Sequence, residues 1–191
     1  MNLPRLILAS ASPRRSELLS KMGFQFQVVP SDAEESHSPS LTAVELSQIN
    51  AWRKARSVAR RFPDHLVIGV DTLVTLDAKL YGKPRDRADA ARMLFELQGK
   101  THLVVSGVCL LHLDRQRQTV FAETTLVAFR PMTTGTIQTY HDRVHPLDKA
   151  GAYAIQHDAG ELVASFNGSF DNVVGLPTEL LLRKLQDFKL P

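Results

Sequence analysis

The chain has 191 residues, of which 43% are hydrophobic and 23% charged, proportions typical of a globular protein with a real core. Its formal net charge of +3 argues against stable nucleic-acid binding through bulk charge. The single cysteine, Cys109, excludes a disulfide within the chain, and no apolar run approaches the ~20 residues of a membrane span, so we expect a cytoplasmic protein that uses no membrane.

The first predicted elements are a strand, a tight turn and a helix. Residues 6–9 form a short apolar run, and Ser12 is a good N-cap for a helix over residues 13–22. This helix begins with Arg14 and Arg15, although cations at a helix N-terminus cost a few tenths of a kcal/mol up to ~1. A bound phosphate would remove that conflict, whereas the alternative is that both arginines extend into solvent.

A second strand over residues 24–29 is followed by a polar segment over residues 30–39. The segment contains Asp32, Glu34 and Glu35. It is either a solvated acidic loop or a source of carboxylates for Mg²⁺, which binds one or two carboxylates together with substrate phosphate oxygens.

The next helix is predicted to begin after Thr42, because Glu45 completes a capping box. An apolar stripe at helical spacing consists of Val44, Ala51, Trp52, Ala55, Val58 and Ala59. Trp52 is therefore expected in the core. Lys54 lies beside the stripe and is either a solvated lysine or a phosphate contact.

Asp71 is the strongest candidate for a catalytic group. Residues 66–70 have the continuous apolar run of a buried central strand, residues 73–76 continue it, and residues 77–79 are expected to turn a hairpin. Asp71 is thus flanked by apolar residues, where a carboxylate is costly unless it is paired, coordinated or used. The alternative is a structural aspartate that caps a turn.

The second half of the chain is predicted to mix long strands with helices. The expected elements are a basic turn at 81–85, a helix over 86–98, strands over 101–113 and 118–129, a helix from 133 or 134 to 140, a strand over 161–166 and a final helix over 177–188. His141 and His145 have the spacing of helical metal ligands, but Pro146 follows at once, so a solvated helix end is preferred.

Residues 148–156 are rich in glycine and alanine, which let a backbone approach a neighbouring chain or a ligand closely. Tyr153 and Gln156 would offer a stacking surface and an amide to a nucleobase. The alternative is a tightly packed crossover with no ligand.

Together these elements predict an α/β fold with a mixed twisted sheet and flanking helices, because hairpins interrupt any parallel alternation. The sequence contains no Walker A lysine motif and no dinucleotide glycine fingerprint. Residues 1–191 are expected to form one domain.

Several stretches, taken together, resemble the Maf family of nucleoside-triphosphate pyrophosphatases. They are collinear, span essentially the whole chain, and comprise residues 8–15, 69–74, 82–84, 148–153, 155–156 and 174–177. The resemblance implies an inosine-triphosphatase-like fold, with two lobes around a cleft, that is often dimeric. It also implies hydrolysis of a nucleoside triphosphate to the monophosphate and pyrophosphate with a divalent cation, Mg²⁺ or Mn²⁺.

The resemblance also implies roles for individual residues. Asp71 matches the general base, and Glu35 matches an acidic residue that holds the metal together with Asp71. The phosphate-handling positions are Ser10, Arg14, Arg15, Lys54 and Lys83. Arg14, Thr72 and Gln156 look like the specificity residues of the subgroup that hydrolyses dTTP and UTP.

Two departures from the family pattern bear on substrate preference: Ala154 stands where glycine is common, and His157-Asp158 replaces a glycine-bearing segment. CTP and modified pyrimidine nucleotides stay open as further substrates. The alternatives are a pyrophosphatase for 7-methyl-GTP or damaged purines, and a nucleotide-sensing regulator of cell division.

Overall fold

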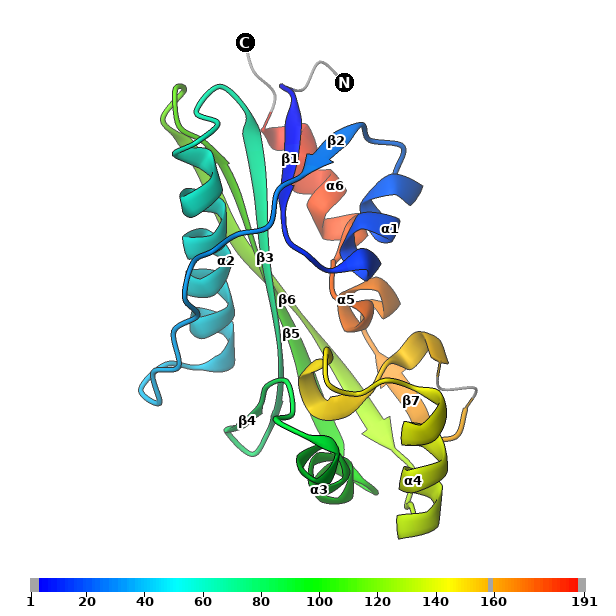
Figure 1. Ribbon diagram of the computed structural model, residues 1–191. Helices are drawn as coiled ribbons and strands as arrows, with labels where there is room; N and C mark the ends of the chain where they lie inside the picture. Colours follow the sequence, from blue (N-terminus) through cyan, green and yellow to red (C-terminus); the bar gives the residue numbers. More distant parts are fainter. Residues whose placement is uncertain (1–3, 158–159, 189–191) are drawn as a thin grey trace. The chain divides into compact units, whose positions relative to one another are not determined.

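The computed structural model describes residues 4–157 and 160–188, so Asp158 lies outside the described part. Its elements (Figure 1) are β1 (Leu6–Ala9), α1 (Pro13–Lys21), β2 (Phe26–Val28), α2 (Ala43–Ala59), β3 (Leu66–Leu76), β4 (Lys79–Tyr81), α3 (Arg87–Leu97), β5 (Thr101–His112), β6 (Arg117–Phe129), α4 (Thr134–Arg143), the 3₁₀ turns η1 (Ala150–Ala152) and η2 (Ile155–His157), β7 (Val163–Asn167), α5 (Phe170–Val174) and α6 (Thr178–Asp187).

The strands form one mixed sheet in the order β2-β1-β3-β5-β6-β7, with β4 paired to β3. β1 runs parallel to β2 and β3, whereas β4 is antiparallel to β3, and β7 is antiparallel to β6. This arrangement confirms the predicted α/β class with a mixed sheet. The predicted cleft between two lobes stays a prediction.

The chain divides into two compact units. Unit 1 contains the described residues up to Asp71, residues 106–123 and the described residues from Gly175 onward, and unit 2 contains residues 72–105 and 124–174. The chain passes from unit 1 to unit 2 within β3, between Asp71 and Thr72. The extent of the predicted single domain is not tested by this division.

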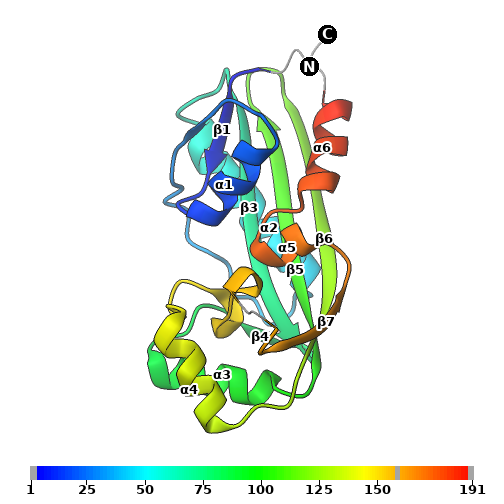
Figure 2. The same ribbon diagram turned by 90° about the vertical axis from the view of Figure 1, so that its right-hand side faces the viewer.

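In unit 1, α2 lies on one side of β1 and β3, and α1 and α6 lie on the other side (Figures 1 and 2). The contact face of α2 consists of small side chains, with Ala51, Ala55 and Ala59 fully buried. They pack with β1 and β3 residues such as Ile7 and Val67 in one apolar cluster. Small residues on the helix allow its axis to come close to the sheet.

Two glycines on the sheet allow that close approach. A Cβ atom added at Gly69 of β3 would lie 2.2 Å from the carbonyl oxygen of Ala51 and 2.7 Å from the amide nitrogen of Ala55. A Cβ added at Gly107 of β5 would lie 2.3 Å from the carbonyl carbon of Ser47. The α2 backbone therefore rests directly on the backbone of the sheet.

Gly69→Ala is expected to destabilise the protein by about 1–3 kcal/mol, because the added methyl group meets backbone atoms that cannot move independently. The free energy of unfolding from urea titration measures this loss. Gly82→Ala is the matched control, since no atom lies within 4 Å of a Cβ added there. Equal stability of the two variants would contradict the close contact.

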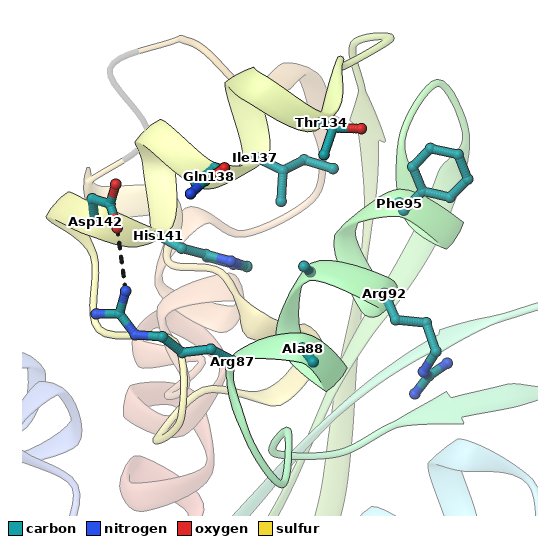
Figure 3. Close-up of a pocket in the computed structure, with 10 residues that line it drawn as sticks. Arg87, Ala88, Arg92, Phe95, Thr134, Ile137, Gln138, His141 and Asp142 are labelled. Atoms are coloured by element: carbon teal, nitrogen blue, oxygen red, sulfur yellow. Dashed lines mark hydrogen bonds and ion pairs between the residues drawn. The ribbon is translucent and has the colours of Figure 1, made fainter.

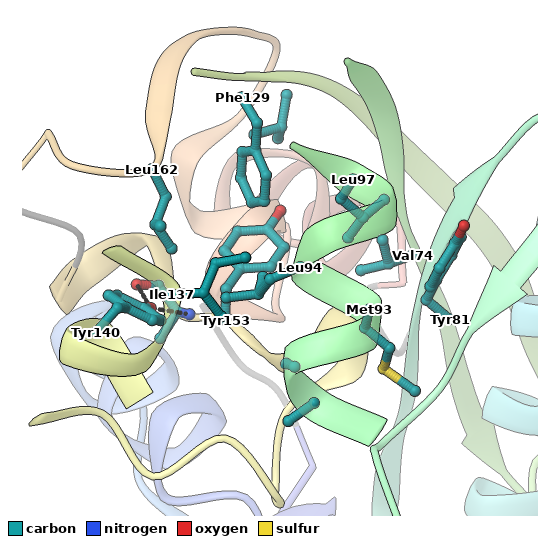
Figure 4. Packing of buried hydrophobic residues seen from close by; sticks show 14 of the residues in the cluster. Val74, Tyr81, Met93, Leu94, Leu97, Phe129, Ile137, Tyr140, Tyr153 and Leu162 are labelled. Atoms are coloured by element: carbon teal, nitrogen blue, oxygen red, sulfur yellow. Dashed lines mark hydrogen bonds between the residues drawn. The ribbon is translucent and has the colours of Figure 1, made fainter. Parts of the chain in front are cut away.

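Unit 2 has its own apolar core, in which α3 and α4 lie side by side (Figure 2) and pack in one cluster with residues of β3, β5 and β6. Its aromatic centre joins His102, Phe129 and Tyr153 in edge-to-face contacts with ring centroids 4.6–5.5 Å apart. Figure 4 shows Phe129 and Tyr153 beside the apolar face of α3. Tyr153 is thus a core residue, and the prediction that it offers a stacking surface to a nucleobase is wrong.

His102 is a buried titratable group in this core. Its Nε2 lies 2.8 Å from the Tyr153 hydroxyl. Burial lowers the pKa of His102 to about 4, below its ordinary value of 6.5. Because the unfolded chain then binds a proton more readily than the folded one, this residue destabilises the fold as pH falls from about 6.5 towards 4, and contributes nothing above that range.

His102→Gln, which keeps a hydrogen-bonding amide but cannot titrate, should reduce this acid sensitivity. The expected difference between the two proteins is up to about 1.4 kcal/mol per pH unit within the window. Urea unfolding of both proteins at pH 7.5 and 5 checks it. The other histidines are common to both proteins, so identical slopes would exclude His102 as the source.

The structure corrects several predicted elements. The second strand is limited to Phe26–Val28, and α4 continues to Arg143 instead of ending at Tyr140. The extension places His141 on the buried face of α4, where it is 5% exposed and its Nε2 lies 3.3 Å from the Ala152 carbonyl oxygen. The prediction of a solvated helix end is therefore wrong for His141.

Two further differences concern α2 and the last third of the chain. Trp52 is only partly buried, and its Nε1 donates to Gln118, while Val44 of the same predicted stripe is 40% exposed. The short helix α5, Phe170–Val174, was not predicted. The short strand β4, Lys79–Tyr81, and the 3₁₀ turns η1 and η2 lie where no strand or helix was predicted, whereas the remaining helices and strands match their predictions to within a few residues.

Candidate active site

Asp71 is the buried centre of a cluster of polar groups in unit 1. It lies within β3 and is only 3% exposed. Its Oδ1 accepts a hydrogen bond of 2.6 Å from Lys54 Nζ, and its Oδ2 accepts one of 3.2 Å from Asn50 Nδ2. The predicted need for a partner is thus met by two side chains of α2, one helical turn apart.

Lys54 joins two carboxylates through one ammonium group. Its Nζ lies 2.6 Å from Glu35 Oε1 and 2.6 Å from Asp71 Oδ1. The side chain of Lys54 is 14% exposed, compared with 39% for Glu35 and 5% for Asp71. Lys54 is therefore not a solvated lysine, and removing one member of such a buried pair typically costs about 3–5 kcal/mol.

The acidic segment is held against α2 and is not a free loop. The Ser36 amide donates to Asn50 Oδ1 at 2.7 Å, and Asn50 Nδ2 donates back to the Ser36 carbonyl oxygen at 3.3 Å. Nearer its start, the hydroxyl groups of Ser31 and Ser57 are 2.8 Å apart, and the Ser31 hydroxyl accepts from the Ala33 amide. The two contacts of Ser36 with Asn50 bring the neighbouring Glu35 to Lys54 and Asp71.

A second polar cluster in unit 1 surrounds the beginning of α1. Arg15 donates from Nε to the Gly175 carbonyl oxygen and from Nη1 to Ser10 Oγ and the Val70 carbonyl oxygen, at 3.0–3.1 Å. Burial lowers the pKa of Arg15, and the neighbouring Arg14 adds to this effect, whereas Asp71 and Glu35 oppose it. Through its hydrogen bonds, Arg15 connects α1 to Ser10, which directly follows β1, and to Val70, the residue before Asp71.

The N-terminus of α1 suits an anion. Ser12 occupies the N-cap position as predicted and Pro13 the first turn, but the Ser12 side chain makes no capping hydrogen bond. The first turn contains no acidic residue, although it contains Arg14 and Arg15. The amide groups of this turn and the two guanidinium groups therefore provide positive potential next to Ser10.

The remaining predicted site residues belong to unit 2. Thr72 follows Asp71 in β3 and is partly buried, whereas Lys83 and Gln156 are exposed, the first after β4 and the second in η2. Within this unit the Gly151 amide donates to the Gly82 carbonyl oxygen, so the turn before Lys83 lies against η1. The assembly of Thr72, Lys83 and Gln156 with the Asp71 cluster stays a prediction.

The residues around Asp71 fit a divalent cation that also binds substrate. Glu35 and Asp71 both contact one Nζ, so their carboxylates are close enough to share a cation. Mg²⁺ needs only one or two carboxylates when phosphate oxygens and water complete its octahedron. Within residues 4–157 and 160–188, no group of three or more His, Cys, Asp or Glu side chains could hold a metal without a substrate.

Unit 2 contains a separate cavity of about 450 Å³. Figure 3 shows it between α3 and α4, with Phe95 and Ile137 beside it and the Arg87–Asp142 ion pair at its end. None of the predicted site residues lines this cavity.

No helix in the part of the chain that the structure describes is long and apolar enough to cross a membrane.

Sequence reasoning missed two participants in these clusters, Asn50 and Gly175. A signal for Asn50 was available, because it lies four residues before the predicted Lys54 and this spacing places both side chains on one face of α2, beside the apolar stripe. The role of Gly175 as a backbone acceptor for Arg15 had no sequence signal, because it depends on a contact between residues 160 positions apart.

Comparison with known proteins finds similarity over nearly the whole chain. A family model described as Maf-like protein matches residues 5–188. A protein from Gloeobacter violaceus is 46% identical over 184 residues, which cover 96% of each chain. One from Symbiobacterium thermophilum is 43% identical, covering 99% of this chain and 96% of its own, and one from Bacillus velezensis is 42% identical, covering 97% of each. All three similar proteins are named dTTP/UTP pyrophosphatase.

Proposed function

This chain belongs to the family of Maf-like proteins, and we propose that it is a hydrolase that cleaves dTTP and UTP to the nucleoside monophosphate and pyrophosphate. Several relatives at 42–46% identity carry the name dTTP/UTP pyrophosphatase. The observation that carries the proposal is the buried Asp71 carboxylate, which shares Lys54 with Glu35 in unit 1. Hydrogen bonds from Lys54 and Asn50 hold this carboxylate in one place, where it can serve a water molecule.

In the proposed reaction, Asp71 is the general base. Its carboxylate accepts a proton from the water that attacks the triphosphate, and the bond between the α- and β-phosphates breaks. Hydrolysis of this kind needs an oriented nucleophile and charge neutralisation more than covalent help from the protein. Two hydrogen bonds orient the Asp71 carboxylate for that role.

The positive groups neutralise the charge of the triphosphate. We assign this role to Arg14, Arg15, Lys54 and Lys83, together with the amide groups at the N-terminus of α1, and we assign Ser10 to phosphate binding through its neutral hydroxyl group. Arg15 keeps its hydrogen bonds to Ser10 and Val70 in this role, and these bonds fix the position of its charge. An ammonium group has three N–H donors, so Lys54 can serve a phosphate oxygen beside its two carboxylates.

Glu35 and Asp71 would hold the divalent cation, Mg²⁺ or Mn²⁺, through one carboxylate each. When bound, such a cation supplies positive charge that polarises the phosphate oxygens it contacts. The protein side chains then have to keep two carboxylates close together without substrate, and Lys54 does this by pairing with both. A homodimer and a cytoplasmic location belong to the same proposal, as does the absence of stable nucleic-acid binding.

Arg14, Thr72 and Gln156 are proposed to select the base. Thr72 and the exposed Gln156 carry hydrogen-bonding groups, and a site that pairs with the polar edge of one base rejects a base that leaves those groups unpaired. Thr72 immediately follows Asp71 in β3, so base selection and water activation depend on neighbouring residues of one strand.

Pyrophosphate release from a panel of nucleotides tests the proposal directly. With Mg²⁺ and with Mn²⁺, the purified protein should hydrolyse dTTP and UTP faster than CTP, 7-methyl-GTP and the purine triphosphates. Release from 7-methyl-GTP alone would overturn the assignment of the base while keeping the reaction. Nucleotide binding without any release would instead support a nucleotide sensor.

Asp71→Asn should reduce kcat for dTTP by about 10²-fold or more, because general-base catalysis typically contributes 10²–10⁴-fold. The substitution keeps the size of the side chain, so the circular dichroism spectrum should be unchanged. Asp77→Asn, in the exposed turn between β3 and β4, is the control and should keep wild-type turnover. A wild-type rate for Asp71→Asn would show that another group activates the water.

A further inference from the structure

We propose that Asn50 is a positioning residue for the reaction, which fixes the Asp71 carboxylate and sets its distance from the Glu35 segment. The inference rests on the proposed function in that Asp71 is taken as the general base. Asn50 is 1% exposed and lies on the same face of α2 as Lys54, one turn away. Each of the two residues donates a hydrogen bond to a different oxygen of the Asp71 carboxylate.

The hydrogen bonds to Asp71 fix its orientation. Lys54 Nζ holds Oδ1 at 2.6 Å and Asn50 Nδ2 holds Oδ2 at 3.2 Å. With Lys54 alone, the carboxylate could rotate about its Cβ–Cγ bond, because that torsion has a broad energy profile. A second donor at the other oxygen removes this freedom, so the oxygen that faces the water is defined before substrate binds.

Only one orientation of the Asn50 amide satisfies its neighbours. Oδ1 accepts from the Ser36 amide at 2.7 Å, and the two hydrogens of Nδ2 serve Asp71 Oδ2 and the Ser36 carbonyl oxygen. The reversed amide would place a carbonyl oxygen against a carboxylate and an NH₂ group against an amide N–H. The network therefore assigns the donor side of Asn50 to Asp71.

The same amide connects Asp71 to the acidic segment. Ser36 follows Glu35, and both of its backbone polar groups bind Asn50. Asn50 thus fixes the backbone next to Glu35, while Lys54 fixes the Glu35 carboxylate itself. The separation of the two proposed cation-binding carboxylates depends on Asn50 as well as on Lys54.

Asn50→Leu and Asn50→Asp test this role in the full-length protein. Leucine is similar in size to asparagine and removes the amide, whereas aspartate keeps an acceptor for the Ser36 amide but places an acceptor against Asp71 Oδ2. We expect kcat for dTTP to fall at least 10-fold in Asn50→Leu and further in Asn50→Asp, with KM within 3-fold of wild type. If Asn50 only maintained the fold, both substitutions would lower the melting temperature and the fraction of active protein. The kcat of the active fraction would then not fall in the order wild type, Asn50→Leu, Asn50→Asp.

The matched control is Ser31→Ala, which removes a hydroxyl that ties the same segment to Ser57 of α2 but contacts neither Asp71 nor Glu35. It should keep wild-type kcat. The crystal structure of Asn50→Leu supplies a readout that does not depend on turnover, and it should show the Asp71 carboxylate rotated away from its wild-type orientation.

The outcomes separate this inference from the proposed function. If the wild type releases pyrophosphate and Asn50→Leu does so with the same kcat, Asn50 is only structural and the inference is overturned. If the wild type releases none from any nucleotide, the proposed function fails, and the orientation of Asp71 in the Asn50→Leu crystal decides the inference alone. An unchanged carboxylate in that crystal overturns it.

Discussion

The burial of the Asp71 carboxylate is the constraint on which the rest of unit 1 depends. An isolated charge in this position would cost several kcal/mol, so the fold has to bring partners to it. Those partners, Lys54 and Asn50, are both on α2, and they reach β3 only because the helix backbone rests on Gly69. Small residues at the helix–sheet contact are thus a requirement of the charged cluster beside it.

Charged residues near the site serve the fold and the proposed chemistry at once. Arg15 connects α1 to Ser10, Val70 and Gly175, and Lys54 connects α2 to Glu35 and Asp71. Each cation is held by protein oxygens on several elements, so its charge is fixed in place in the absence of substrate. Preorganised charge of this kind stabilises a reacting phosphate without first paying for reorganisation.

The sequence predicted what is encoded locally. The capping box at Thr42, the N-cap position of Ser12 before α1 and the continuous apolar run of β3 all lie where their residues indicated. The burial of His141 and Tyr153 was not predictable in this way. The sequence pattern around each residue is compatible with an exposed side chain. His141 is buried through its contact with Ala152, and Tyr153 is buried through its contacts with His102 and Phe129.

The candidate site shows the same division between identity and arrangement. Asp71, Lys54 and Glu35 stood out as single residues, but their spacing of 17 and 19 positions along the chain gave no sign that one ammonium joins them. Asn50 and Lys54 differ in how they respond to the substrate. The lysine ammonium is positively charged, so when it turns towards a phosphate oxygen its hydrogen bond to the carboxylate weakens. The asparagine amide has no net charge, so the incoming anion attracts it far less. Asn50 can therefore keep Asp71 in place while Lys54 responds to the substrate.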